Sequence, residues 1–180
     1  STAPADLPRI GFTIKQSGDF TNRIGTIEVG TRAWLDGPHG HFVLANRQDD
    51  RLAFIAGGVG LAPIMSMLRQ LRADGWEAPL CLVYGNRTEN QILYREELEA
   101  MSDMLDFRLS LVLSEPPPDW PGPRGQLSAT ILDQCLERSD RARWTYFVCG
   151  PPPMMDSVEQ SLKEFGVPAN RIVAERFRYD

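Results

Sequence analysis

One stretch, Leu52-Ala-Phe-Ile-Ala-Gly-Gly-Val-Gly-Leu-Ala-Pro63, decides the fold. Residues 52–56 are a continuous apolar run, which is typical of a strand buried on both faces of a parallel sheet. The turn Gly57-Gly-Val-Gly60 follows, and residues 64–72 place apolar side chains at helical spacing. Strand, glycine turn and helix in this order predict the first part of a βαβ unit.

The same alternation continues to the end of the chain. Further apolar runs predict strands at residues 80–84, 107–113, 144–148 and 171–174. Amphipathic segments predict helices at residues 91–101, 128–136 and 154–165. Because right-handed crossovers join parallel strands, we expect an α/β fold with a doubly wound, five-stranded parallel sheet.

The region before Arg51 has a different pattern. β-branched and aromatic residues between glycine-rich turns predict short antiparallel strands at residues 10–14, 33–36 and 41–44, and residues 19–27 have room for one short helix. Strands so few and short cannot close a barrel. We therefore expect residues 1–45 to be a remnant of a β-barrel and residues 46–180 to form the α/β domain, with the boundary in the polar stretch 45–51.

Composition narrows the possible functions. The 180 residues include 19 basic and 24 acidic ones, so no nucleic-acid partner is expected, because no basic excess neutralises phosphates. No apolar run reaches about 18 residues, so this chain is not expected to span a membrane itself. Cys81, Cys135 and Cys149 are widely spaced, which fits a reducing compartment. With two histidines and no Cys-x-x-Cys pair, no metal site is expected.

Small or polar residues follow four of the five expected strands. They are Gly57 and Gly58, Gly85 and Asn86, Ser114 and Glu115, and Cys149, Gly150 and Pro151. Because ligands of open α/β sheets bind outside the carboxyl ends of the strands, these positions are candidate binding residues. The alternative is that glycine and serine simply end strands, as they often do.

The glycine turn suits a phosphate group. Glycines let the backbone approach a ligand closely, and the following helix offers unpaired N–H groups to an anion. Pro63 fits the first helical turn, where its missing N–H costs nothing. The pattern is not G-x-G-x-x-G, and Asn86 and Arg87 stand where an acidic residue would be expected. The glycines alone are therefore weak evidence.

A second unusual stretch, Cys149-Gly-Pro-Pro-Pro-Met154, leads from a strand into a helix. The prolines fix φ before the helix begins and hold Cys149 at the end of the strand. A buried, inert cysteine is the alternative reading.

Together, the glycine turn and the Cys149 stretch resemble the pyridine-nucleotide domain of the ferredoxin–NADP reductase superfamily. The branches that resemble the chain most are ferric reductase and NADPH-oxidase-like proteins and the reductase components of bacterial oxygenases. Phe12-Thr-Ile-Lys15, Gly18-Asp-Phe-Thr21 and Asp36-Gly-Pro-His-Gly-His-Phe42 are similar to the last strands of the family's flavin barrel. The resemblance implies that residues 1–45 are the C-terminal remnant of an FAD-binding β-barrel, and that the rest of the barrel precedes Ser1.

The resemblance also implies roles for the candidate residues. Gly57, Gly58, Val59 and Gly60 would cradle the pyrophosphate of NAD(P)H, and Cys149 would lie beside the nicotinamide as a positioning group. Glu175 would stabilise the arrangement for hydride transfer, and Phe177, or Tyr179 in its place, would stack on the flavin. The remaining cofactor-binding candidates in the two domains are Pro63, Gly150, Pro151, Pro152 and Met154, and, on the flavin side, Thr21, Gly37 and Pro38.

The choice of nucleotide is expected to depend on the end of the third strand. Glu115 would repel a 2′-phosphate there and accept hydrogen bonds from ribose hydroxyls, so NADH is preferred over NADPH. Arg87 or Arg124 would favour NADPH instead by binding the phosphate.

We expect an NAD(P)H:acceptor flavoprotein oxidoreductase, of which this chain is a fragment that is inactive without the rest of the FAD domain. Hydride would pass from NAD(P)H to FAD in the full-length protein, and electrons would then pass to haem, iron–sulfur or ferric iron. The partner would be a haem membrane domain or an iron–sulfur protein. The expected location is cytoplasmic, on the cytoplasmic side of any membrane that anchors the parent. The alternative is a nucleotide-binding regulatory module without redox turnover.

Overall fold

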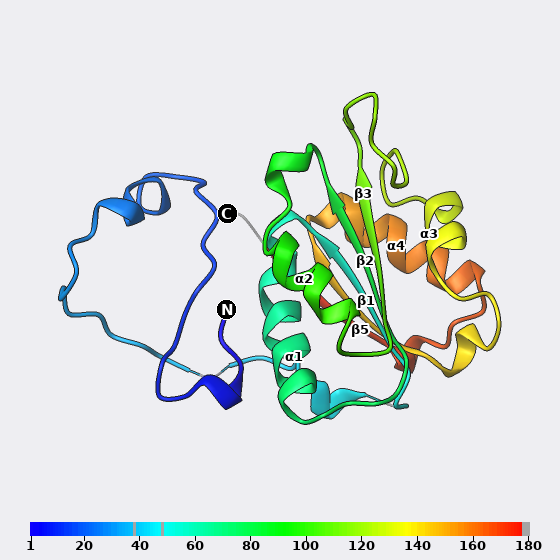
Figure 1. Cartoon of the computed structure of the whole chain (residues 1–180), viewed down its shortest axis with the longest axis horizontal. Helices are drawn as coiled ribbons and strands as arrows, with labels where there is room; N and C mark the ends of the chain where they lie inside the picture. The colour runs from blue at the N-terminus through cyan, green and yellow to red at the C-terminus, as the bar shows by residue number, and fades with distance from the viewer. Residues whose placement is uncertain (38, 48, 178–180) are drawn as a thin grey trace.

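The computed structural model describes residues 1–37, 39–47 and 49–177. Its centre is a five-stranded sheet in the order β3-β2-β1-β4-β5, with every neighbouring pair parallel (Figure 1). The strands are β1 (Leu52–Gly57), β2 (Leu80–Asn86), β3 (Phe107–Leu113), β4 (Thr145–Gly150) and β5 (Ile172–Arg176). The doubly wound, five-stranded parallel sheet expected from the apolar runs is confirmed.

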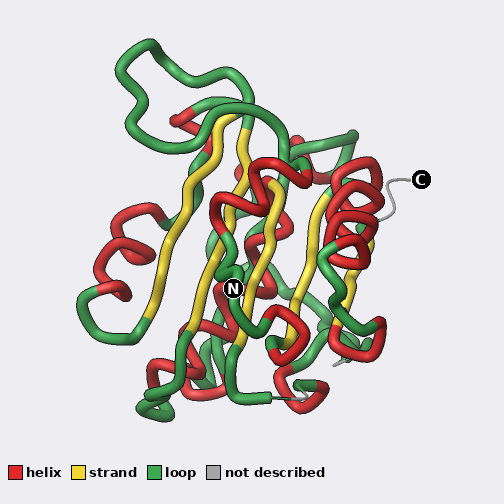
Figure 2. Tube along the Cα trace, turned by 90° about the vertical axis from the view of Figure 1, so that its right-hand side faces the viewer, coloured by secondary structure: helices red, strands yellow, loops and turns green. Residues whose placement is uncertain are grey.

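Helices cover both faces of this sheet (Figure 2). They are α1 (Leu61–Ala73), α2 (Arg95–Ser102), α3 (Ala129–Cys135) and α4 (Pro152–Glu164). Side chains of α1 and α2 pack with Phe54, Tyr84 and Phe147 on one face, and those of α3 and α4 pack with Ile55 and Val148 on the other. All six residues of β1 are buried, which explains why this strand is apolar without alternation.

The strand order places a topological switch point at the carboxyl end of β1. β1 lies between β2 and β4, so Ala56 is paired with Tyr84 on one side and with Cys149 on the other. The connections after β1 and β4 run to opposite faces of the sheet, to α1 and α4. A crevice of this kind is where open α/β sheets bind their ligands.

One expected helix is interrupted. Residues 91–101 were expected to be helical throughout, but a 3₁₀ turn at Glu89–Gln91 is followed by α2, which starts only at Arg95. Tyr94 precedes α2 with φ +53°, a left-handed conformation that stops a helix from running through it. The hydroxyl of Tyr94 contacts that of Thr13 at 2.5 Å, which ties this turn to the N-terminal segment.

The expected antiparallel strands at residues 10–14, 33–36 and 41–44 are wrong. The described residues before β1 contain no strand, only 3₁₀ turns at Pro4–Asp6, Thr21–Thr26 and Leu44–Asn46. The turn at Thr21–Thr26 confirms the short helix expected within residues 19–27. A strand needs a partner for its backbone groups, and here the segment forms an open loop beside the sheet (Figure 1). Phe12 is 64% exposed and Trp34 is 84% exposed, so the loop also lacks a core.

The N-terminal segment is held on the α/β body near both of its ends, and Phe42 packs against the apolar cluster on the α1 face of the sheet. Ser66 of α1 donates to the carbonyl of Thr2 at 2.7 Å, and the amide of Ala5 donates to Gln70 at 3.0 Å. The division into residues 1–45 and 46–180 stays a prediction. Within the described part of the chain, no helix has the length and apolar character needed to cross a membrane.

Candidate functional site

The glycine turn after β1 has one position that is open and two that are tightly packed. Gly58 has φ +52°, and a Cβ built on it would meet nothing within 4 Å. Its conformation makes glycine the favoured residue, and the space around it stays free. An open backbone turn directly before a helix is the geometry that a pyrophosphate requires.

Gly57 and Gly60 serve close packing instead. A Cβ on Gly60 would collide with the carbonyl group of Cys149 and lie 2.9 Å from the Cα of Gly150. A Cβ on Gly57 would collide with the sulfur of Met154 and lie 3.1 Å from Pro151. The glycine turn and the Cys149 stretch, far apart in sequence, are thus pressed together at the switch point.

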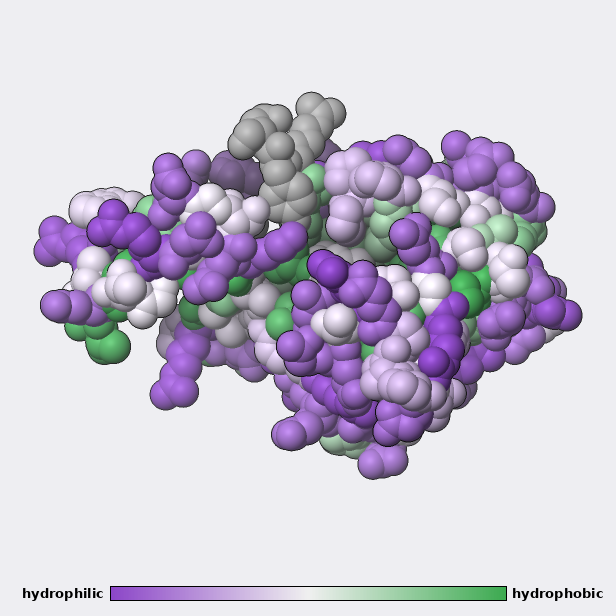
Figure 3. Space-filling model, turned by 90° about the horizontal axis from the view of Figure 1, so that it is seen from above, coloured by the Kyte–Doolittle hydropathy of each residue, from purple (hydrophilic) through white to green (hydrophobic). Residues whose placement is uncertain are grey.

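The helices that leave this point present uncompensated positive ends. Neither α1 nor α4 has an acidic residue in its first turn, so no carboxylate of its own competes with a bound anion. Pro152 occupies the first position of α4 and Pro63 lies in the first turn of α1. Figure 3 looks onto this edge from above, with the N-terminal segment on the left and the α/β body on the right.

Tyr84 supports the glycine turn, a role that its spacing in the sequence does not indicate. Its spacing indicates a core residue, and it is indeed fully buried. Its hydroxyl, however, donates to the carbonyl of Gly58 at 3.1 Å and accepts from the amide of Leu93 at 3.4 Å. Burial raises the pKa of Tyr84, which keeps the hydroxyl protonated as a donor. A tyrosine at the end of a strand beside a glycine turn was the available signal.

Cys149 is fully buried at the carboxyl end of β4, on the same face of the sheet as Phe147. Burial raises the pKa of the thiol to about 12, with a smaller contribution from the nearby carboxylate of Glu175. The thiol therefore stays protonated at neutral pH, and a protonated thiol is a poor nucleophile. This geometry suits a positioning group rather than a covalent catalyst.

Glu175 is paired with Cys149 across β4 and β5, and paired residues of parallel strands share one face of the sheet. Phe177 packs at the edge of the same apolar cluster that contains Cys149. The structure thus brings these three candidates together on one face. Two further candidates, Tyr179 and Pro38, lie outside the described residues.

The ends of β2 and β3 form a second part of the edge. The backbone ladder continues beyond β3, since the amide of Ser114 donates to Asn86 and that of Glu115 donates to Arg87. The side chain of Arg87 forms an ion pair with Glu115 at 2.8 Å. Arg124 donates instead to the carbonyls of Pro118 and Trp120, so it holds the proline-rich loop.

Other candidates have structural neighbours of their own. A Cβ on Gly85 would lie 3.0 Å from Leu127, so this glycine permits close packing at the end of β2. Thr21 accepts a hydrogen bond from the amide of Ser17, and Gly37 has φ +139°. Both belong to the N-terminal segment, and among the described residues no contact joins them to the glycine turn. Their expected flavin-binding role stays a prediction.

The fold and this edge define a nucleotide-binding α/β domain of the doubly wound class. The model of the "Oxidoreductase NAD-binding domain" family matches residues 54–160, and the chain belongs to that family.

Curated relatives agree with this assignment. The chain is 31% identical to ferredoxin–NADP reductase B of Sorangium cellulosum, over 98% of this chain and 75% of that protein. It is 28% identical to NADH-cytochrome b5 reductase 1 of Laccaria bicolor, over 89% of this chain and 53% of that protein. It is 33% identical to the reductase component of propane 2-monooxygenase of Rhodococcus jostii, over 93% of this chain and 47% of that protein. The chain thus spans about half the length of the last two relatives.

A solved structure has the same fold. The cytochrome b5 reductase domain of Ulva prolifera nitrate reductase superimposes with a TM-score of 0.77 at 26% identity, covering 88% of this chain and 64% of that one.

Proposed function

We propose that this chain is the NAD(P)H-binding part of a flavin-dependent oxidoreductase that passes hydride from NADH to FAD and then electrons to an acceptor. The observation that carries the proposal is the switch point itself. There an open, left-handed Gly58 lies on a turn that is packed against the Cys149 stretch. The family match and the names of the relatives support the same activity.

The residues of this chain would bind and orient the nucleotide. The turn around Gly58 and the positive ends of α1 and α4 would hold its pyrophosphate. The protonated Cys149 and the facing Glu175 would fix the plane of the nicotinamide, and the apolar cluster beneath them would exclude water. FAD, when bound, supplies the conversion of a two-electron hydride donor into a source of single electrons.

NADH is the nucleotide that we propose. The Arg87–Glu115 ion pair supports this choice, because Glu115 neutralises the arginine that would otherwise attract a 2′-phosphate. Arg124 donates to backbone carbonyls and Arg87 is paired with Glu115, so neither guanidinium is free to bind a 2′-phosphate.

The acceptor would be a haem or iron–sulfur protein or domain, or ferric iron. The relatives support the first two classes, since one is named as a cytochrome b5 reductase and another as a ferredoxin–NADP reductase. We place the protein in the cytoplasm, on the cytoplasmic side of any membrane that anchors it. Three buried, unpaired cysteines support a reducing compartment.

A regulatory module that binds the nucleotide without turnover is the second candidate. The shared face of Cys149, Glu175 and Phe177 favours the enzyme, because a module that only binds has no need to position a hydride. Reduction of bound FAD by NADH in the full-length protein is expected, and its absence would favour the regulatory module.

Equilibrium titrations with NADH and NADPH test the binding site. Tighter binding of NADH is expected, and the Gly58→Ala variant should weaken both nucleotides. Tighter binding of NADPH would overturn the proposed preference, and binding of neither by the FAD-loaded protein would overturn the proposed site.

A further inference from the structure

The last residue of β5, Arg176, spans two acidic residues of α4. Its guanidinium contacts Asp156 and Glu159 at 2.7 Å each. The two carboxylates lie three residues apart on the helix, so one planar fork reaches both of them. Arg176 alternates with Glu175 and Phe177 and therefore points to the opposite face of the sheet from theirs.

These contacts close a short ring around the site. α4 begins at Pro152, directly after Cys149, Gly150 and Pro151. Arg176 connects α4 back to the end of β5, where Gly150 is its strand partner and Glu175 is the partner of Cys149. The position of Glu175 relative to Cys149 is thus fixed twice, by the strand pairing and by the ion pairs.

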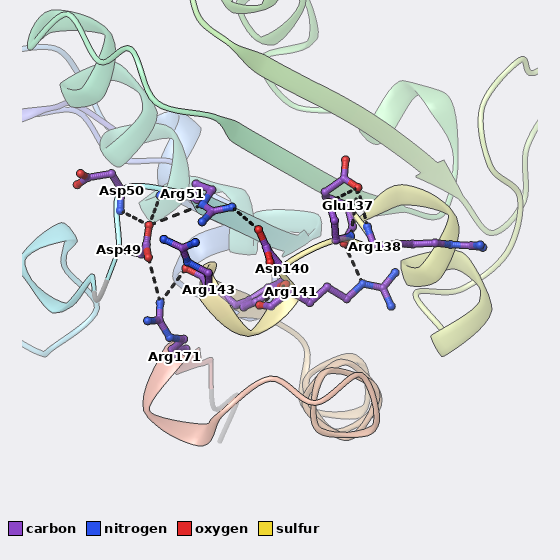
Figure 4. A network of polar contacts seen from close by, with 11 residues as sticks. Asp49, Asp50, Arg51, Glu137, Arg138, Asp140, Arg141, Arg143 and Arg171 are labelled. Atoms are coloured by element: carbon purple, nitrogen blue, oxygen red, sulfur yellow. Dashed lines mark hydrogen bonds and ion pairs between the residues drawn. The ribbon is translucent and has the colours of Figure 1, made fainter.

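The second fixing matters because β5 is an edge strand. Among the strands of the described residues, β4 is its only neighbour, so one ladder of hydrogen bonds holds its end. The start of β5 has an arginine anchor of its own. Arg171 donates to the carbonyl of Arg143 at 2.8 Å and lies 3.7 Å from Asp49 (Figure 4). An arginine thus anchors the strand at each end, but only Arg176 lies next to the candidate catalytic residues.

We propose that Arg176 is a positioning residue for hydride transfer, whose ion pairs with α4 hold Glu175 opposite Cys149 and Phe177 just beyond the end of β5. The inference rests on the proposed function. Exposed ion pairs contribute little to stability, so the expected effect is on geometry more than on folding. Small displacements at a reacting centre cost far more in rate than in binding.

The test compares Arg176→Gln with Arg171→Gln in the FAD-loaded, full-length protein. Arg176→Gln should lower the limiting rate of flavin reduction by NADH about tenfold and leave the NADH dissociation constant almost unchanged. Arg176→Lys, which keeps the charge, should recover part of the rate. Hydrogen exchange without NADH is the second measurement, and Arg176→Gln should speed exchange at Glu175 and Phe177. The matched control, Arg171→Gln, should speed exchange only at the start of β5 and keep the rate.

Each result decides one of the two claims. If NADH does not reduce the flavin of the unaltered protein, the proposed function fails and this inference fails with it. If the unaltered protein is active and Arg176→Gln is equally fast, only the inference fails. If Arg171→Gln slows flavin reduction as much as Arg176→Gln does, the effect is a general loosening of β5, and the inference fails as well. Should Arg176→Gln not fold, the Asp156→Asn/Glu159→Gln variant removes the same ion pairs from the helix side and must show the same loss of rate.

Discussion

Cys149 of β4 lies directly opposite Glu175 of β5, while Ala56 of β1 faces it from the other side. The thiol is thus enclosed by two neighbouring strands and has no exposed surface. Burial, and to a smaller extent the carboxylate of Glu175, disfavour a negative charge on the thiol. Cys149 therefore stays a neutral thiol beside Glu175 and does not become a reactive nucleophile.

Alkaline pH should destabilise the fold through its buried thiols. Burial raises the pKa of both Cys81 and Cys149 from an ordinary value of 9.0 to about 12. The unfolded chain releases these protons at a lower pH than the folded chain does, so the free energy of unfolding falls as pH rises through this window. Each thiol should contribute about 1.4 kcal/mol per pH unit.

Urea unfolding at several pH values above about 8 measures this slope. Cys81→Ala should remove the contribution of one thiol, whatever it does to stability at neutral pH. A free energy of unfolding that stays constant up to about pH 11 would contradict the expectation.

Gly60→Ala should destabilise the chain by about 3 kcal/mol, because the added methyl meets backbone atoms that cannot rotate away. Thermal or urea unfolding measures the loss. A variant as stable as the original chain would show that the ends of β1 and β4 separate more easily than their packing indicates.

Gly58→Ala should behave differently. Its methyl group meets no atom within 4 Å, so the cost is the strain of a left-handed alanine, about 1–2 kcal/mol. The variant should remain folded and bind NADH several-fold more weakly, because the methyl occupies the space of the pyrophosphate. Unchanged affinity in a titration would place the phosphates elsewhere.

Tyr84→Phe should weaken nucleotide binding without a large loss of structure. It leaves the carbonyl of Gly58 without its hydroxyl partner, which costs about 1–3 kcal/mol of stability. Tyr146→Phe is the matched control, since Tyr146 is also buried and donates to the carbonyl of Arg141, beyond the opposite end of the strands. The two variants should have similar melting temperatures, and only Tyr84→Phe should bind NADH more weakly than the original chain. Equal affinities would limit Tyr84 to packing.

Glu115→Arg should shift the preference from NADH toward NADPH by about tenfold or more, because it replaces a repulsive charge by an attractive one. Arg87→Gln is the control, because it breaks the same ion pair without adding a cation. The ratio of the two dissociation constants is the measurement. An unchanged ratio in Glu115→Arg would remove this residue from the choice of nucleotide.

The sheet was predictable because its strands are buried on both faces. A short continuous apolar run such as residues 52–56 is compatible with few structures other than a buried strand, and glycine or proline marks where such a run ends. The prediction of strands in the N-terminal segment was wrong because composition does not show whether a strand has a partner. Their β-rich composition describes a local preference, but pairing needs a distant partner, and Trp34 and Phe12 remain exposed without one.

The site was predictable in its residue types and less so in its contacts. Glycine turns and the Cys149 stretch stand out in the sequence, whereas the hydroxyl of Tyr84 reaches a backbone carbonyl 26 residues away. The left-handed Tyr94 had no signal either, since tyrosine has no preference for that conformation. Contacts that join a side chain to a remote backbone follow from the assembled sheet and not from local sequence.

The contact of Gly60 with the carbonyl of Cys149 has a consequence for how the protein is made. During synthesis the glycine turn leaves the ribosome well before β4 does. At that stage the Cys149 stretch, which packs against the turn in the folded protein, is still missing. The nucleotide site is completed only when the second half of the sheet docks beside β1. Because a ligand stabilises only the state that binds it, NADH would favour chains that have finished folding and give no help to those that have not.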